Sequence, residues 1–343
     1  MRPGGFAMHT TGFEDALQTN TFTLQWHITQ SCELNCRHCY DRSERKEVGL
    51  EEGRNLLDQL YNFCTRYHVQ GQVTFTGGNP ILHPQFEKLY RAAHERGFRI
   101  ALLANPTRKS ILEKLKAIQM PEFYQISLEG LEEHNDYIRG RGHFQRSLQF
   151  LDLLKDLDIY SMVMLTLTRA NVNQVLPLAE ILRDRVDSFT FNRLAMVGEG
   201  ASLASVEPKD YRNFLADYRK AAEKNPVMRL KDNLFNLLHY QQELPLMSGC
   251  TGYGCGAAFN FVSVLPDGQV HACRKFPSPI GDLNEQDLLT IYESDLAVKY
   301  RKGASSCFQC RIRPLCGGCP AVSYGFNKDP LHEIDPYCFL ERQ

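Results

Sequence analysis

The sequence predicts an α/β protein built around a parallel sheet, followed by a small cysteine-rich module. Short apolar runs alternate with helical periods between about residues 22 and 196. This alternation is typical of successive β/α units, whose sheet is either doubly wound or part of a TIM-like barrel. Twelve cysteines occur in the chain, and eight of them lie beyond residue 249. A length of 343 residues suits one large α/β unit with an appendage.

The predicted elements follow from apolar periodicity, which is two for strands and 3.6 for helices. The strands are expected at 22–29, 72–76, 98–103, 122–127, 159–166 and 187–192. Helices are expected between them at 51–68, 84–96, 108–117, 143–156 and 172–184. Further on, Asp267-Gly268 indicates a hairpin between Phe259–Leu265 and Gln269–Cys273. We expect an N-terminal arm at 1–21, a barrel domain at 22–205, a helical bridge at 206–245 and a cysteine-rich domain at 246–343.

Composition limits the location and the partners of the protein. With 39 basic and 40 acidic residues, no overall field attracts nucleic acid or an anionic membrane, and no basic stripe supports RNA modification. No apolar run approaches a membrane span, and residues 1 to 20 lack a signal-peptide core. We therefore expect a cytoplasmic protein without nucleic-acid or membrane partners. A reducing compartment argues against disulfides, and tight cysteine spacing favours metal. Only Cys64 fits an ordinary buried thiol.

The first cysteine group directly follows the first predicted strand. Cys32, Cys36 and Cys39 have C-x3-C-x2-C spacing and precede Tyr40. Three thiolates on a tight loop can hold three irons of a [4Fe–4S] cluster and leave the fourth iron open. Two alternatives exist: a zinc knuckle completed by His27 or His38, and thiols that belong to disulfides.

This loop resembles the signature of radical S-adenosylmethionine (AdoMet) enzymes, and Tyr40 fits the aromatic position after the third cysteine. The resemblance implies a partial (β/α)6 TIM-like barrel with the cluster loop after its first strand. It also implies that AdoMet binds the open iron through its amino and carboxylate groups. Electron transfer from the cluster then yields a 5′-deoxyadenosyl radical, which abstracts hydrogen from the substrate.

Other motifs lie at the predicted carboxyl ends of strands, where such folds place their chemistry. Gly77-Gly78-Asn79-Pro80 is similar to the family's Gly-Gly-Glu-Pro motif, which holds the AdoMet amino group. Asn79 replaces the usual Glu, so a carboxylate partner for the ammonium is lost. Asn105 resembles the Asn of the family's Thr-Asn-Gly turn, although it could simply cap the next helix.

Three further contacts to AdoMet are implied by the resemblance. Ser127 and Glu129 match a Ser-Leu-Asp-Gly segment that meets the ribose or methionine part, and Glu129 is one methylene longer than the usual Asp. Arg139 is expected to pair bidentately with the AdoMet carboxylate, the alternative being a solvated arginine at a helix end. Leu194 ends a segment that the family lays against adenine.

The second cysteine group resembles the SPASM domain, which carries two auxiliary [4Fe–4S] clusters. The shared features are a Cys-x12-Gly-x4-Cys hairpin, a C-x2-C-x5-C run, a Gly-Gly-Cys-Pro segment and a late cysteine. The final spacing of the run is x2, whereas the family usually has x3. Carried over by position, one cluster takes Cys250, Cys255, Cys273 and Cys319, and the other takes Cys307, Cys310, Cys316 and Cys338. A structural zinc ribbon is the alternative.

Taken together, the resemblances imply three [4Fe–4S] clusters, AdoMet, and a flavodoxin or ferredoxin as external electron donor. They favour a maturase that oxidises a ribosomally made peptide to a crosslink, a thioether or a similar product. The leader would be recognised directly or by a partner. The length of the chain and its Gly-Gly-Asn-Pro segment are similar to those of maturases proposed for thio- or seleno-oxazole peptides.

Three alternatives to this function remain open at the level of sequence. An anaerobic sulfatase maturase is disfavoured, because Arg274 and Lys275 stand where an acidic base is expected. A tetrapyrrole-modifying enzyme of the same superfamily and a zinc-stapled binding module without catalysis are the others. No catalytic acid or base is assigned. Tyr324, Arg274, His271 and Asp136 are candidates for testing, and each has an equally good structural explanation.

Overall fold

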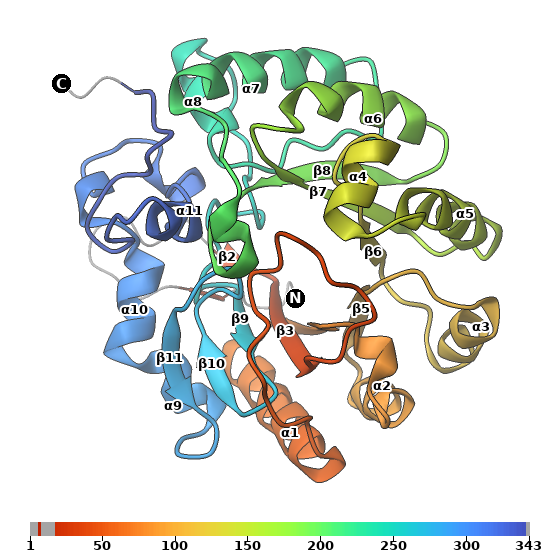
Figure 1. The fold of residues 1–343 in the computed structure, drawn as a ribbon. Helices are drawn as coiled ribbons and strands as arrows, with labels where there is room; N and C mark the ends of the chain where they lie inside the picture. Colours follow the sequence, from red (N-terminus) through yellow and green to blue (C-terminus); the bar gives the residue numbers. More distant parts are fainter. Residues whose placement is uncertain (1–5, 8–17, 341–343) are drawn as a thin grey trace. The chain divides into compact units, whose positions relative to one another are not determined.

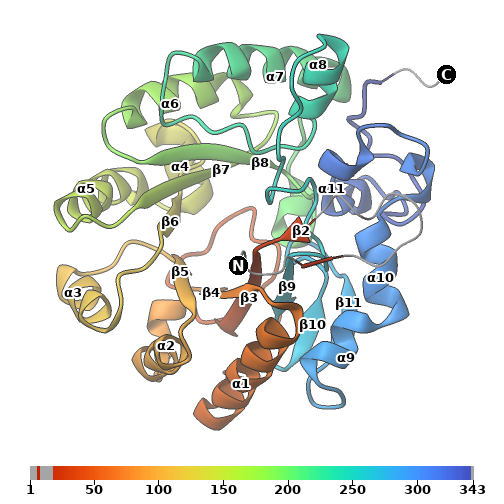
Figure 2. The same ribbon diagram turned by 180° about the vertical axis from the view of Figure 1, so that it is seen from behind.

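The computed structural model describes residues 6–7 and 18–340 (Figure 1, Figure 2). The chain forms two compact units that interleave along the sequence. Unit 1 comprises Met1–Glu33, Ser43–Tyr124 and Gly256–Arg301; unit 2 comprises Leu34–Arg42, Gln125–Cys255 and Lys302–Gln343. Most of the predicted arm at 1–21 lies outside the described residues. The predicted domain boundaries at 205 and 245 stay a prediction.

Unit 1 contains six neighbouring sheet strands in the order β11-β10-β9-β3-β4-β5. Strands β3, β4 and β5 are parallel, β9 joins the other edge of β3 in parallel, and β10 and β11 complete the sheet in antiparallel fashion. A short antiparallel pair, β1 and β2, precedes them. The bounds are β1 Phe6–Ala7, β2 Gln18–Thr19, β3 Thr21–Thr29, β4 Gln70–Gly77, β5 Arg99–Leu103, β9 Phe261–Val264, β10 Gln269–His271 and β11 Pro279–Asp282.

The helices of unit 1 cover the apolar face of this sheet, and Figure 1 shows α1 and α2 side by side. Alternate β3 residues, from Phe22 to Ile28, are fully buried, and the Phe22 ring lies 4.3 Å from that of Phe63 on α1. Because strand side chains alternate, His27 points to the opposite face of β3. The helices are α1 Leu50–Tyr67, η1 Pro80–Leu82, α2 Phe86–Glu95, α3 Lys109–Ile118, α9 Leu288–Glu293 and α10 Asp295–Lys302.

Unit 2 contains the strands in the order β6-β7-β8, and β7 and β8 are parallel. The strands are β6 Tyr124–Ser127, β7 Ser161–Leu167 and β8 Ser188–Arg193. The α-helices are α4 Glu132–Arg139, α5 His143–Asp156, α6 Val175–Leu182, α7 Pro208–Ala222, α8 Phe235–Gln241 and α11 Pro320–Gly325. Short 3-10 turns are η2 Val172–Gln174, η3 Gly198–Ser202, η4 Ser305–Cys307 and η5 Arg313–Leu315.

All six strands predicted before residue 196 are present, within two residues at each end. The five predicted helices are present too, although the last begins as the 3-10 turn η2 before α6. The hairpin at Asp267-Gly268 and the helical character of 206–245 are also confirmed. The prediction lacked α4, α9, α10, α11 and β11. No helix in the described part of the chain is both long enough and apolar enough to cross a membrane.

Candidate functional site

The site begins in unit 1, where the loop after β3 lies directly on the backbone of the glycine pair after β4. The N–H of Gly78 donates to the carbonyl of Thr29 at 2.9 Å, and that of Asn79 donates to the carbonyl of Ser31 at 2.7 Å. A Cβ on Gly77 would lie 2.2 Å from the Thr29 oxygen, and one on Gly78 would lie 2.3 Å from the Ser31 oxygen. Gly77 also has a φ of +128°. Both glycines are therefore required by this close approach.

Two predicted asparagines contact the start of the cysteine loop in unit 1. Asn79 is 2% exposed, and its Nδ2 lies 3.0 Å from each carboxylate oxygen of Glu33. Asn105 Nδ2 lies 3.5 Å from Sγ of Cys32. The structure therefore brings the Gly-Gly-Asn segment and Asn105 to the start of the cysteine loop, and adds Glu33, which the motifs did not identify. The contacts of Asn79 and Asn105 with AdoMet stay predictions.

In unit 2, the remaining loop residues Leu34–Arg42 form a turn closed by Cys39 N–H and the Cys36 carbonyl, 3.2 Å apart. The 3-10 turn η3 supports it, because Glu199 N–H donates to the Cys39 carbonyl at 2.9 Å. A Cβ on Gly198 would lie 2.6 Å from the Tyr40 oxygen, and its φ is +59°. Glycine is therefore needed where η3 meets the turn.

A buried carboxylate organises the side chains beside this turn. Glu129, 1% exposed, accepts from Arg139 Nε at 2.9 Å and Nη2 at 2.6 Å. His38 Nε2 lies 2.8 Å from Glu129 Oε1, and Thr166 N–H donates to Oε2 at 2.8 Å. Burial alone would raise the pKa of Glu129, but the neighbouring His38 and Arg139 and these hydrogen bonds outweigh it and lower the pKa. Arg139 Nη1 also lies 3.8 Å from Cys36 Sγ.

The structure thus joins Glu129 and Arg139, each of which the sequence had assigned to a contact with AdoMet, in one ion pair next to Cys36. Ser127 is the last residue of β6 and is partly exposed. Leu194 directly follows β8 and is buried. The assigned contacts of these four residues with AdoMet stay predictions.

Four of the C-terminal cysteines line one cavity in unit 2. Cys307, Cys310, Cys316 and Cys338 surround a space of about 470 Å³, together with apolar side chains such as Leu234 and Leu237. These are the four thiols that position alone assigned to one auxiliary cluster. The shortened spacing separates Cys316 of this group from Cys319, which was assigned to the other auxiliary cluster.

The second group of auxiliary cysteines is divided between the units. Asn233 joins two of its segments in unit 2, because its Oδ1 accepts from Cys250 N–H at 2.6 Å and its Nδ2 donates to the Gly318 carbonyl at 2.8 Å. A Cβ on Gly317 would lie 3.7 Å from that of Cys255. Cys250, Cys255 and Cys319 belong to unit 2, whereas Cys273 belongs to unit 1.

A buried arginine supports the Cys319 segment. Arg193 donates from Nε to Asp232 and from Nη1 to Asp335, each at 2.8 Å. Asp335 Oδ2 in turn accepts from Cys319 N–H at 2.8 Å. Sequence reasoning missed this role for Arg193, as it missed His38 and Asn233, because the partners are far apart in the chain and no local motif marks them.

Comparison with known proteins identifies these features. Residues 26–182 match the model of the radical SAM superfamily, and residues 255–320 match that of SPASM, an iron–sulfur cluster-binding domain. The chain is a radical SAM enzyme with a SPASM domain. Its fold is accordingly the partial (β/α)6 barrel followed by a small cysteine-rich domain, and the two domains imply [4Fe–4S] clusters and AdoMet.

Individual relatives of this radical SAM/SPASM enzyme align over most of its length. An AdoMet-dependent heme synthase of Methanosarcina barkeri is 25% identical, over 92% of this chain and 95% of the relative. The subtilosin biosynthesis protein AlbA of Bacillus subtilis is 25% identical, over 90% of this chain and 70% of the relative. Streptococcus suis SuiB, solved with its precursor peptide SuiA, has a TM-score of 0.71 at 17% identity, over 94% of this chain and 77% of SuiB.

The cysteine groups of the enzyme fit iron–sulfur clusters by their donor chemistry. None of the twelve cysteines, all of which lie in the described residues, forms a disulfide. No set of three or more Cys, His, Asp or Glu in the described part is arranged around one metal ion. Cluster thiolates each bind a different iron, so they need not converge on one point. Cys64 is buried as predicted, and burial raises the pKa of its thiol to about 12.

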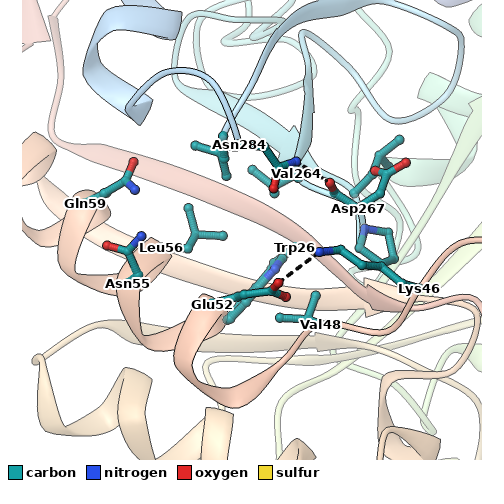
Figure 3. Close-up of a pocket in the computed structure, with 14 residues that line it drawn as sticks. Trp26, Lys46, Val48, Glu52, Asn55, Leu56, Gln59, Val264, Asp267 and Asn284 are labelled. Carbon is teal, nitrogen blue, oxygen red and sulfur yellow. Dashed lines mark hydrogen bonds and ion pairs between the residues drawn. The ribbon is translucent and has the colours of Figure 1, made fainter.

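A second, smaller cavity lies in unit 1, beside Trp26 of β3 (Figure 3). It has a volume of about 130 Å³ and is lined by Trp26 of β3, by α1 residues including Glu52, and by the β9–β10 hairpin. Lys46 and Glu52 pair across its rim at 2.9 Å (Figure 3). Neither Gly77 nor Gly78 is among the residues that line this cavity, so it is separate from the glycine-pair site.

Proposed function

We propose that this enzyme oxidises a ribosomally made peptide, forming a crosslink, a thioether or a similar modification. The observation that carries the proposal is that the chain has two kinds of cysteine group. One is a loop of three cysteines, and the other is a set of four cysteines that line a cavity in unit 2. AlbA, whose name assigns it to bacteriocin biosynthesis, aligns with nearly the whole chain. The fold of SuiB, solved with a precursor peptide, supports the same substrate class.

Cys32, Cys36 and Cys39 would hold the reactive cluster, which with AdoMet supplies hydrogen-atom abstraction. Several residues of the chain contact the cysteine loop and its sulfur atoms. Gly77 and Gly78 bring backbone close to the cysteine loop, Asn105 donates to the Cys32 sulfur, and Arg139 faces the Cys36 sulfur. Donors to thiolate sulfur stabilise its negative charge, so these contacts favour a ligated cluster.

The auxiliary cysteines would hold two more clusters, for three in all. Cys307, Cys310, Cys316 and Cys338 form one complete set of four thiols around a shared cavity. With every iron ligated by cysteine, such a cluster supplies electron transfer and leaves no open iron for substrate. An external flavodoxin or ferredoxin would reduce the enzyme. Thiolate-ligated clusters need reduced cysteines, so the proposal includes a cytoplasmic location.

The residue after Cys273 argues against sulfatase-maturase chemistry, where an acidic base is expected. Arg274 stands there, and its Nη1 donates to Thr76 Oγ1 at 3.1 Å, one residue before Gly77. A guanidinium is always protonated and cannot accept a proton as a base. Instead, it presents positive charge beside the glycine pair in unit 1.

Tetrapyrrole modification is a second candidate, favoured by one specific observation. The AdoMet-dependent heme synthase of Methanosarcina barkeri aligns over 95% of its own length. The two candidate functions differ in the substrate that is modified when AdoMet is cleaved. A comparison of a peptide with a tetrapyrrole as substrate therefore separates them.

The first experiment is anaerobic purification with iron and sulfide counts for the wild type and for the triple variant Cys32→Ala/Cys36→Ala/Cys39→Ala. At four irons per cluster, we expect about twelve irons in the wild type and about eight in the variant, with AdoMet cleavage lost. Zinc without sulfide would contradict the proposal. About eight irons in the wild type would mean that one auxiliary cluster is missing.

The second experiment tests the substrate. The reduced enzyme is incubated with AdoMet and either a precursor peptide encoded near its gene, such as a thio- or seleno-oxazole precursor, or an iron tetrapyrrole. We expect 5′-deoxyadenosine to form together with a peptide that has lost two hydrogen atoms. Turnover of the tetrapyrrole alone would overturn the peptide assignment, and the triple variant is the control for both substrates.

A further inference from the structure

Asn79 holds the carboxylate of Glu33 with a geometry that fixes both side chains. Its Nδ2 lies 3.0 Å from both Oε1 and Oε2, whereas its Oδ1 accepts from Ile81 N–H at 3.4 Å. An amide turned the other way would bring its oxygen against the carboxylate and its NH2 against an N–H. The contacts therefore fix the orientation of the amide. Asn79 is 2% exposed, so this donor has little freedom to turn away.

The carboxylate of Glu33 carries a negative charge that no cation of the chain neutralises within the described residues. Its hydrogen-bond partner is the neutral amide of Asn79, and no Lys, Arg or His nitrogen in the described residues forms an ion pair with it. Glu33 is exposed and directly follows Cys32, itself exposed. A fixed, accessible and uncompensated carboxylate is suited to bind a cationic group of a ligand.

The position of this carboxylate matches a gap in the cofactor motif. Asn79 occupies the place where related enzymes have the Glu of Gly-Gly-Glu-Pro, and the lost carboxylate would have met the AdoMet ammonium. Gly77 and Gly78 still bring the loop backbone into contact with this segment. We propose that Glu33 is the anionic partner of the AdoMet ammonium and that Asn79 is the positioning residue that holds it. In this assignment the carboxylate is supplied by the cysteine loop instead of the glycine motif.

A purely structural role would have a different signature. In that case the Asn79–Glu33 contact would only fasten the cysteine loop to the η1 turn. Glu33→Gln keeps the shape of the side chain and one oxygen that accepts from Asn79, so fastening would survive while the charge is lost. The variant therefore separates charge from packing. Glu47→Gln is a matched control, since Glu47 contacts the same loop through Thr29 Oγ1 at 2.9 Å without touching Asn79.

The test measures AdoMet binding to reconstituted protein by equilibrium dialysis, alongside iron counts. We expect Glu33→Gln to weaken AdoMet about 10- to 100-fold, the effect of one charge-assisted hydrogen bond, with iron unchanged. Glu47→Gln should stay within about twofold. The probe for the ammonium is the AdoMet analogue whose amino group is replaced by a keto oxygen. Its affinity should be the same for the wild type and for Glu33→Gln.

A double variant makes the inference sharper. Glu33→Gln/Asn79→Glu returns the carboxylate to the glycine motif and should recover most of the lost affinity. Asn79→Glu alone places two carboxylates together and should bind no tighter than the wild type. Unchanged AdoMet binding in Glu33→Gln, or an equal loss for AdoMet and the keto analogue, would overturn the assignment. The proposal rests on AdoMet binding at this site, so a wild type that failed to bind AdoMet would overturn the proposed function as well.

Discussion

Replacing Arg193 with Met should loosen the Cys319 segment far more than the loss of an ordinary surface arginine. The Arg193 side chain is 3% exposed, and its two carboxylate partners, Asp232 and Asp335, are 9% and 2% exposed. Met fills similar apolar space but leaves both carboxylates buried without a cation. Asp335 also accepts the Cys319 N–H, so the disturbance reaches a proposed cluster ligand directly.

The magnitude follows from the burial of the network. Removing one partner of a buried ion pair costs about 3–5 kcal/mol, because the other charge stays desolvated. The matched control is Arg169→Met, which removes a 3.0 Å pair with Glu207 whose side chains are 61% and 50% exposed. Such surface pairs contribute about 0.2–1 kcal/mol. The variants should therefore differ by at least about 2 kcal/mol, or about 30-fold in a local opening equilibrium.

Hydrogen–deuterium exchange on metal-free protein measures this opening. Peptides covering 315–338 should exchange at least about 30-fold faster in Arg193→Met than in Arg169→Met. After reconstitution, iron should fall from about twelve to about eight in Arg193→Met only, as one four-iron cluster is lost. Equal exchange in the two variants would refute the reasoning, since it would show that the ion network does not hold this segment.

Two further predictions concern the predicted cofactor site. Gly77→Ala should destabilise the protein and weaken AdoMet binding more than Gly97→Ala, because both have positive φ but only Gly77 would place its Cβ 2.2 Å from the Thr29 oxygen; urea midpoints that are equal for the two would contradict this. Glu129→Gln should cost about 3 kcal/mol at pH 7, since it breaks a buried pair. The pKa of Glu129 is lowered in the fold, so its contribution is complete above the ordinary Glu pKa of 4.5 and is lost as pH falls below it. The difference in urea midpoint between wild type and Glu129→Gln should shrink accordingly in acid, and a pH-independent difference would contradict it.

The sequence predicted those elements whose burial leaves a periodic pattern. β3 alternates apolar and polar residues from Phe22 to Ile28, and α1 has buried residues at helical spacing from Leu56 to Phe63. Helix α4 has the sequence EEHNDYIR and buries only Asn135 and Ile138, so it has no apolar stripe to detect. Helices α9 and α11 have six residues each, too short for a period of 3.6 to stand out.

The same distinction between local and long-range features applies to the candidate site. Cysteine spacing and paired glycines are local patterns, so the sequence could indicate the cluster loop and the glycine segment. Contacts between distant residues leave no such trace. Glu33 meets Asn79 across 46 positions, and Arg193 meets Asp335 across 142. Asn79 in place of Glu suggested that a negative charge is lost from the site. The sequence could not show that the carboxylate of Glu33 lies beside Asn79.

The Glu129–Arg139 pair shows how one contact can direct an arginine toward the cysteine loop. Glu129 binds Nε and Nη2 of the guanidinium, which leaves Nη1 directed at the Cys36 sulfur. A guanidinium is planar, so fixing two of its nitrogens also fixes the direction of the third. Any carboxylate that Arg139 binds must therefore approach the donors that Glu129 leaves, on the side of the cysteine loop. His38, two residues after Cys36, is a further donor to Glu129. It therefore links the cysteine loop to the carboxylate that orients Arg139.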